Sequence, residues 1–108
     1  MPNEIRQYKV TIQDPAVEML IHHARFLAQV NETAAEQLTK EFEAQAKTLE
    51  IMPERCPWLN GPIVPAHKYR KLIFEKHYML LFQIIGNNVF VDAMVDCRQD
   101  YAWLLINH

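Results

Sequence analysis

The chain has 108 residues, of which 50% are hydrophobic and 22% are charged, and its formal net charge is −2. This length suits one domain with one core, so we expect residues 1–108 to form a single domain. The 11 Lys plus Arg against 13 Asp plus Glu argue against a protein that grips phosphate backbones, and the two glycines argue against glycine-rich phosphate loops.

The N-terminal stretch lacks the apolar core of a secretion signal, and no apolar run in the chain approaches the roughly 20 residues of a membrane helix. We therefore expect a cytoplasmic protein without a membrane span. Alternating polar and apolar residues predict a short strand over Tyr8–Ile12. Asp14 and Pro15 then indicate the start of a helix that continues to about Val30.

The first predicted helix carries one apolar stripe, at three- and four-residue spacing. The residues of the stripe are Val17, Leu20, Ile21, Ala24, Leu27 and Ala28. His22 and His23 lie off this stripe and point about 100° apart, so they are poorly placed to share one metal ion. We interpret them as surface histidines, and we expect the chain to need no metal or other cofactor.

A second helix is predicted from Thr33 to about Ile51, because Thr33 and Glu36 have the capping-box pattern. Its buried stripe would be Ala35, Leu38, Phe42, Ala46 and Leu49. The short connection between the two helices predicts an antiparallel helical hairpin.

The stretch Met52–Ala66 contains four prolines and no sustained periodicity, so it is predicted to be an irregular crossing from the helices to a sheet. Trp58 and Leu59 are expected to anchor it to the core, with a binding role for Trp58 as the alternative. Cys56 and Cys97 show no metal-ligand spacing and are expected to be free thiols.

The stretch Tyr69–Asp100 contains three apolar runs, separated by Glu75-Lys76-His77 and by Gly86-Asn87-Asn88. The runs are rich in Val, Ile, Phe and Tyr, and the breaks are typical of hairpin turns. We therefore predict a three-stranded antiparallel meander. The fold class is α+β, with an N-terminal strand and a two-helix hairpin packed on a small antiparallel sheet that ends in the meander.

Both faces of the predicted middle strand are apolar, and two helices can cover only one face. In the last strand, we expect Val89, Val91, Ala93 and Val95 to share one face. The face away from the helices is expected to be partly exposed and to bind a partner protein. The candidate partner-binding residues are Met79, Leu81, Phe90, Met94 and Trp103. Alternatively, the C-terminal segment from Asp100 to Asn107 folds back over this face.

The order of strand, helical hairpin, three-stranded meander and short tail resembles the RelE/ParE toxin superfamily of bacterial toxin–antitoxin pairs. The closest local similarities are Tyr69-Arg70-Lys71-Leu72, Glu75-Lys76-His77-Tyr78 and Val95-Asp96-Cys97-Arg98-Gln99-Asp100. The resemblance covers nearly the whole chain. It implies a toxin that is neutralised by a cognate antitoxin.

The RelE-like branch of this superfamily cleaves messenger RNA on the ribosome without a metal, and cationic side chains stabilise the phosphate there. If this chain were such a ribonuclease, its catalytic residues would be Arg70, His77, Arg98 and Tyr101. The branch usually has an arginine after the hairpin tyrosine, where this chain has Met79. Arg70 and Arg98 have another possible role, which is ion pairing with Asp92, Asp96 or Asp100 across the sheet.

The chain resembles the ParE-like branch more closely, which implies a toxin that poisons DNA gyrase by protein–protein contact. Whether the chain is an enzyme stays open, and the depleted cationic set favours a non-enzymatic toxin. Two alternatives remain, a ribosome-dependent messenger ribonuclease and an inactive family member that only binds an antitoxin. A homodimer and a toxin–antitoxin heterotetramer are both open.

Overall fold

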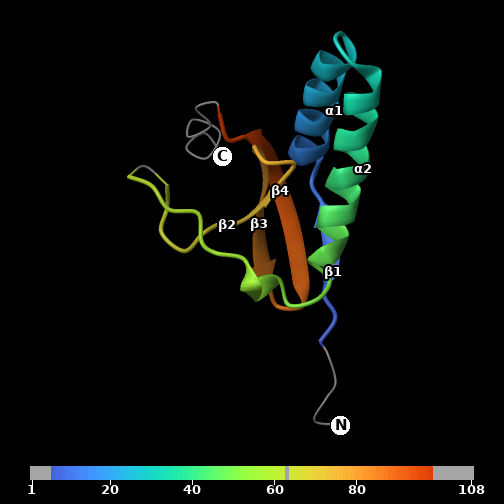
Figure 1. The fold of residues 1–108 in the computed structure, drawn as a ribbon. Coiled ribbons are helices and arrows are strands. Elements are labelled where there is room, and N and C mark those ends of the chain that lie inside the picture. The colour runs from blue at the N-terminus through green and yellow to red at the C-terminus, as the bar shows by residue number, and fades with distance from the viewer. Residues whose placement is uncertain (1–5, 63, 99–108) are drawn as a thin grey trace.

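The computed structural model describes residues 6–62 and 64–98. Its elements follow the chain as β1 (Lys9–Ile12), α1 (Asp14–Ala28), α2 (Glu32–Thr48), a 3-10 turn (Pro53–Arg55), β2 (Arg70–Phe74), β3 (Tyr78–Ile85) and β4 (Asn88–Asp96). Figure 1 shows the two helices side by side along one face of the sheet and projecting beyond the ends of its strands.

The four strands form one sheet in the order β1-β4-β3-β2. The β2-β3-β4 meander is antiparallel, whereas β1 pairs with β4 in parallel. The predicted α+β class, helical hairpin and meander are therefore confirmed, whereas the sheet is mixed and not antiparallel throughout as predicted. Parallel pairing is possible because the whole helical hairpin and the crossing to β2 separate β1 from β4 in the chain.

The helix starts differ slightly from those predicted. The cap of α1 is Gln13, one residue before the predicted Asp14, and α2 is capped by Asn31, whose side chain accepts a hydrogen bond from the Ala34 amide at 3.1 Å. Thr33 lies inside α2 and is not its cap. Asparagine is as good a cap as threonine, and it reaches the amide three residues on in the same way.

The main core lies between the helices and the sheet. It includes Leu38 and Phe42 of α2, Leu80 and Phe82 of β3, and Val91 of β4, all at most 3% exposed. These residues lie at the spacing that turns one face of a helix or strand inward. The helical hairpin is therefore held to the sheet by an apolar layer.

A β-bulge changes the face of β4 partway along its length. Leu81 pairs with Ala93 and Phe82 pairs with Val91, so Asp92 is the extra residue. Val91 packs in the main core, whereas Ala93 packs on the opposite face of the sheet. The prediction that the four residues Val89, Val91, Ala93 and Val95 share one face is wrong, because a bulge reverses the alternation of side chains.

A second core lies on the sheet face away from the helices. The crossing loop, which we define as residues 52–69, packs Leu59 and Tyr69 against Met79, Leu81 and neighbouring residues of this face. Met79 is 2% exposed and Leu81 is fully buried. The expectation that this part of the face is open is wrong, because the crossing loop covers it.

Met94 is also buried, but on the other face. The bulge turns it toward the helices, where it packs in the main core opposite Leu80. Met79, Leu81 and Met94 therefore form no contact surface in the folded chain, in contrast to the prediction. The expected anchoring of the crossing loop by Leu59 is confirmed, since its side chain is 2% exposed.

Among the residues that the structure describes, no helix is long and apolar enough to cross a membrane.

Candidate functional site

One end of the sheet brings the β2–β3 turn next to the residues that follow β4. The amide of Cys97 donates a hydrogen bond to the carbonyl of His77 at 2.6 Å. In the turn itself, Glu75 and Lys76 have left-handed backbone, with φ of 49° and 70°. This conformation is unfavourable for residues with side chains, so the turn is held in place by its neighbours.

Arg98 leaves the end of β4 and bends back onto Asp96. Its Nε donates to Oδ1 at 3.0 Å, its Nη2 donates to Oδ2 at 2.7 Å, and its amide donates to Oδ1 at 2.9 Å. These bonds lower the pKa of Asp96 and raise the pKa of Arg98. The predicted pairing of Arg98 with Asp96 is confirmed, but the two residues are two apart in the chain and the pair does not cross the sheet.

Tyr78 connects this pair to α1. Its ring lies 4.4 Å from that of His77 and 5.6 Å from that of His23, between ring centroids. Burial, and then the negative charge of Asp96, raises the pKa of Tyr78. Burial, and then the neighbouring His22, lowers the pKa of His23. His22 is exposed as predicted, but His23 is half-buried against Tyr78 and is not a surface histidine.

Arg70 is the first residue of β2, at the end of the strand away from the β2–β3 turn. Its guanidinium contacts the crossing loop. Its Nη1 donates to the carbonyl of Cys56 at 2.7 Å and to that of Glu54 at 3.2 Å. The guanidinium carbon also lies 3.9 Å from the centroid of the Trp58 ring, a cation–π contact. Arg70 therefore fastens the crossing loop to the sheet, a role that the sequence analysis did not predict.

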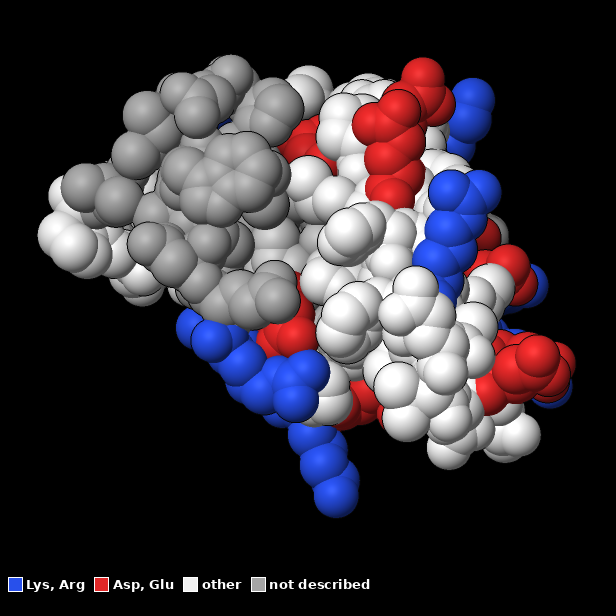
Figure 2. All heavy atoms as spheres, turned by 90° about the horizontal axis from the view of Figure 1, so that it is seen from above, with Lys and Arg blue, Asp and Glu red and all other residues white. Residues whose placement is uncertain are grey.

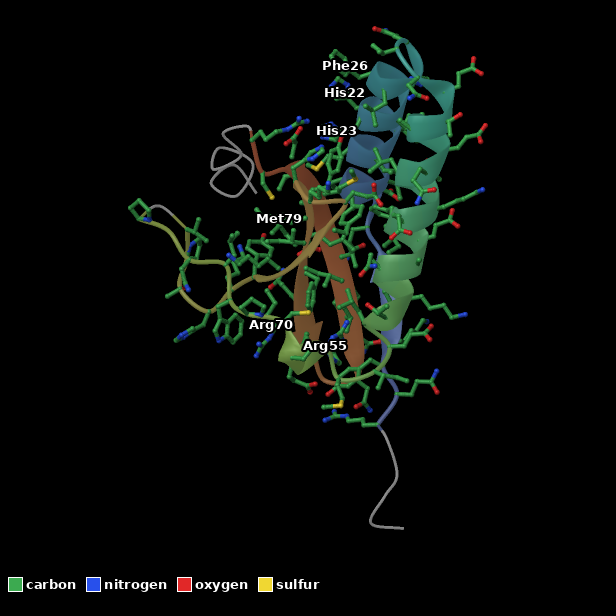
Figure 3. All side chains as sticks on the ribbon, viewed as in Figure 1. His22, His23, Phe26, Arg55, Arg70 and Met79 are labelled. Carbon is green, nitrogen blue, oxygen red and sulfur yellow. The ribbon has the colours of Figure 1, made fainter. Side chains whose placement is uncertain are left out.

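The structure does not bring the proposed ribonuclease residues together. His77 and Arg98 are neighbours at one end of the sheet, whereas Arg70 precedes Phe74 by four residues, or roughly 13 Å of extended strand. Figure 3 shows Arg70 at the end of the molecule opposite His22 and His23. Tyr101, the fourth residue of the set, lies outside the described residues.

A hollow of about 470 Å³ lies beside Arg70. We call it the Trp58 groove, and it is lined by Glu54, Trp58, His67, Lys68, Arg70, Gln83 and Ile84. The carboxylate of Glu54 accepts a hydrogen bond from the hydroxyl of Tyr8, which lowers the pKa of Glu54. The groove thus combines an aromatic ring with cationic side chains and one acidic side chain that already has a partner.

Phe90 and Trp103 differ from the other three candidate partner-binding residues, which are buried. Phe90 pairs with Gln83 of β3 and Thr11 of β1. It is half-buried and is not among the residues that pack under the crossing loop, so it stays partly accessible. Trp103 lies outside the described residues. The partner-binding role of both residues stays a prediction.

The structure exposes apolar side chains that the sequence analysis missed. Phe26 of α1 is 65% exposed, and Val30, in the α1–α2 connection, is 85% exposed. Viewed from this end, the middle of the visible described surface is largely free of Lys, Arg, Asp and Glu (Figure 2). The available signal was that both residues lie off the apolar stripe of the first helix.

The described residues include no group of three or more His, Cys, Asp or Glu side chains that could hold a metal ion. Cys56 is buried and Cys97 is exposed, and both are free thiols as predicted. Burial raises the pKa of the Cys56 thiol.

Comparisons with known proteins agree with this architecture. A solved structure described as "Chromosomal ParDE TA system from P. aeruginosa" has a TM-score of 0.70, with 12% sequence identity over 84% of this chain and 97% of that chain. At this identity the likeness concerns the fold alone. A search of curated proteins found no significant match. The sequence model of the family described as "ParE toxin of type II toxin-antitoxin system, parDE" matches residues 10–101. The chain therefore belongs to the ParE toxin family of type II toxin–antitoxin systems.

Proposed function

We propose that this chain is a toxin that poisons DNA gyrase through protein–protein contact in the cytoplasm and that a cognate antitoxin neutralises it. Membership of the ParE toxin family supports an antitoxin partner. A protein that acts by contact with gyrase needs a complementary surface but does not need a catalytic centre. The separation of the cationic side chains Arg70 and Arg98 in this chain agrees with such a mode of action.

The observation that carries this proposal is the state of Arg70 and Arg98. Arg70 is bonded to two carbonyl oxygens and stacked on Trp58, and Arg98 is bonded to both carboxylate oxygens of Asp96. Cleavage of RNA by a metal-free enzyme needs cationic groups that converge on one phosphate. Here Arg70 begins β2, whereas Arg98 follows β4 beside the β2–β3 turn, so the two arginines do not converge on one position.

The test uses purified chain, DNA gyrase and supercoiled plasmid. A gyrase poison should cause cleaved plasmid to accumulate when the reaction is stopped with detergent, and prior addition of the antitoxin should prevent it. Normal supercoiling together with blocked translation in a parallel reaction would contradict the proposal.

One observation favours ribosome-dependent messenger cleavage as a second candidate. His77 and Arg98 lie side by side, because the Cys97 amide bonds to the His77 carbonyl, and this places an imidazole and a guanidinium at one edge of the molecule. Under this alternative, Arg98→Ala abolishes messenger cuts mapped in a translation extract. Under the gyrase proposal the wild-type chain produces no such cuts.

A growth assay distinguishes an active toxin from an inactive family member that only binds its antitoxin. Expression of the chain without antitoxin should arrest growth if the chain is an active toxin. Unchanged growth at a verified level of folded protein would favour the inactive member.

A further inference from the structure

The charges of this chain are separated between the two sides of its sheet. Residues 14–50, which contain the helical hairpin, carry seven Asp and Glu against three Lys and Arg. Residues 52–76, which contain the crossing loop and β2, carry five Lys and Arg against two Glu. Figure 1 shows the hairpin and the crossing loop on opposite sides of β3 and β4. The net charge of −2 therefore combines an acidic side with a basic side and describes neither of them.

Four cations of the basic side surround one short stretch of the crossing loop, residues 54–58. Arg55 and Lys71 line a hollow of about 420 Å³ that this stretch borders. Lys68 and Arg70 line the Trp58 groove, which the same stretch also borders. We call these four residues the basic band.

Backbone hydrogen bonds hold this part of the crossing loop beside β2. The amide of Lys71 donates to the carbonyl of Pro57 at 3.0 Å, and the amide of Leu59 donates to the carbonyl of Tyr69 at 2.7 Å. The backbone positions of the four cations are therefore fixed relative to one another.

The two arginines of the band are bonded to neutral acceptors. The Nη1 of Arg55 donates to the carbonyls of Ile51 at 3.0 Å and Met52 at 3.1 Å, and the Nη1 of Arg70 donates to the carbonyl of Cys56 at 2.7 Å. A carbonyl oxygen satisfies an N–H group but carries no net charge. The hydrogen bonds therefore orient both guanidinium groups and leave their positive charges uncompensated.

Few carboxylates oppose this positive charge. The ion pair between Arg98 and Asp96 is the only one that the described residues form, and it includes no member of the basic band. The two hollows have a single carboxylate in their linings, that of Glu54, which accepts a hydrogen bond from Tyr8. Four cations thus share one small region with one carboxylate.

We propose that the basic band contacts the sugar–phosphate backbone of the duplex DNA that gyrase holds. This inference rests on the proposed function, because that function places the chain on a complex of gyrase with DNA. Lys and Arg bind phosphates through charge and hydrogen bonds, without reading the base sequence. The cations lie on both flanks of residues 54–58 and not around one pocket, which suits charges that are spaced along a strand.

The separation of charge also gives the chain one orientation on DNA. Phosphates attract the basic band and repel the acidic hairpin, so the band faces the DNA. Phe26, which is 65% exposed, lies at the opposite end of the molecule from Arg55 and Arg70 (Figure 3). The apolar end of the hairpin then points away from the DNA and stays available for contact with protein.

The first test measures binding of the purified chain to a short fluorescently labelled DNA duplex, without gyrase, over a series of salt concentrations. The double variant Lys68→Gln/Lys71→Gln should bind about tenfold more weakly at low salt, and the slope of log affinity against log salt should fall by about two, one for each phosphate contact that is lost. Lys68→Arg/Lys71→Arg keeps both charges and should bind like the wild type.

The matched control is Lys40→Gln/Lys47→Gln, which makes the same change in net charge at two exposed positions of α2. Its affinity should stay within about twofold of the wild type, because these positions lie on the acidic side. Equal weakening in both Gln variants would overturn the proposal, and so would the absence of salt-dependent duplex binding by the folded wild type. Tighter binding of a single-stranded RNA than of the duplex would assign the band to RNA and also overturn it.

The second test repeats the plasmid cleavage reaction with gyrase. Lys68→Gln/Lys71→Gln should cause several-fold less cleaved plasmid to accumulate, while its affinity for gyrase without DNA stays that of the wild type. Unchanged cleavage would overturn the role of the basic band and leave the proposed function standing. If the wild type binds the duplex but causes no cleavage, the proposed function fails, and the assignment to DNA held by gyrase fails with it.

Discussion

Asp96 is a buried carboxylate at the end of β4, and its side chain is 6% exposed while that of Arg98 is 65% exposed. Both of its oxygens accept bonds from Arg98, and no other charged side chain among the described residues is buried. Because the Arg98 side of the pair is exposed to water, the charge attraction contributes little, and the hydrogen bonds from Arg98 to the buried carboxylate account for most of the stabilisation.

Replacing Asp96 with asparagine should lower the free energy of unfolding by about 1–2 kcal/mol at neutral pH, since two charge-assisted bonds weaken. The folded-state pKa of Asp96 lies below its unfolded value, so its contribution is fully present above about pH 4 and is lost as the pH falls below that. Urea unfolding of both proteins across this range measures the effect. An equal difference in stability at acid and neutral pH would contradict the account.

His23 lies on α1 and packs half-buried against Tyr78. The charged or titratable groups near it are His22, Asp96 and Arg98. Burial lowers its pKa, so the unfolded chain takes up a proton first and the folded chain loses stability as the pH falls below about 6.5. His23→Gln should reduce this loss. Urea unfolding above and below that pH measures it, with His67→Gln, at an exposed histidine, as the control. A wild-type stability that does not change across this range would count against the assignment.

The roles of the arginines illustrate what sequence can predict at this scale. Pairing of Arg98 with an aspartate across the sheet is among the predicted alternatives, and the partner is one of the predicted residues, Asp96, although the pair is local and does not cross the sheet. The contact of Arg70 with Trp58 was not predicted. The two residues belong to a loop and a strand whose relative position depends on irregular backbone, and periodicity carries no signal for it.

At the scale of elements, the crossing loop is a structural part of the core. Leu59 packs with Tyr69 against Met79 and Leu81, and this cluster occupies the sheet face that the helices leave uncovered. A sheet with two apolar faces needs cover on both. Here a proline-rich loop supplies it in place of a further helix or a partner protein.

Leu59→Ala should therefore destabilise the chain by about 2–4 kcal/mol, the usual range for a leucine removed from a packed core. The control is Ile73→Ala in β2, which removes a side chain that is 53% exposed and should change stability by about 0.5 kcal/mol or less. Urea unfolding of the three proteins measures the difference. Equal stability of the wild type and Leu59→Ala would show that the loop does not contribute to the core.

Most of the elements could be predicted from the sequence, because periodicity and turn residues determine them locally. The features that could not be predicted have non-local causes. The bulge at Asp92 is visible only when Leu81 and Ala93 are seen to pair, and the cover over Met79 depends on a loop without a repeating pattern. These two features account for the wrong assignment of an exposed apolar face.

At the scale of the whole molecule, the available contact surfaces differ from those expected. The described surface offers the exposed apolar end of the helical hairpin around Phe26 and Val30, and the Trp58 groove at the other end of the sheet. The positions of Arg70 and Phe26 in Figure 3 show this separation. A toxin that contacts an antitoxin and a target protein needs surfaces of this kind.

Recovery of gyrase that is covalently attached to chromosomal DNA, from cells that express this chain, tests the central proposal most directly. The account predicts that such complexes increase soon after induction, that co-expressed antitoxin prevents the increase, and that messenger RNA stays uncut. Growth arrest with fragmented messenger RNA and no increase in covalent gyrase complexes would contradict it.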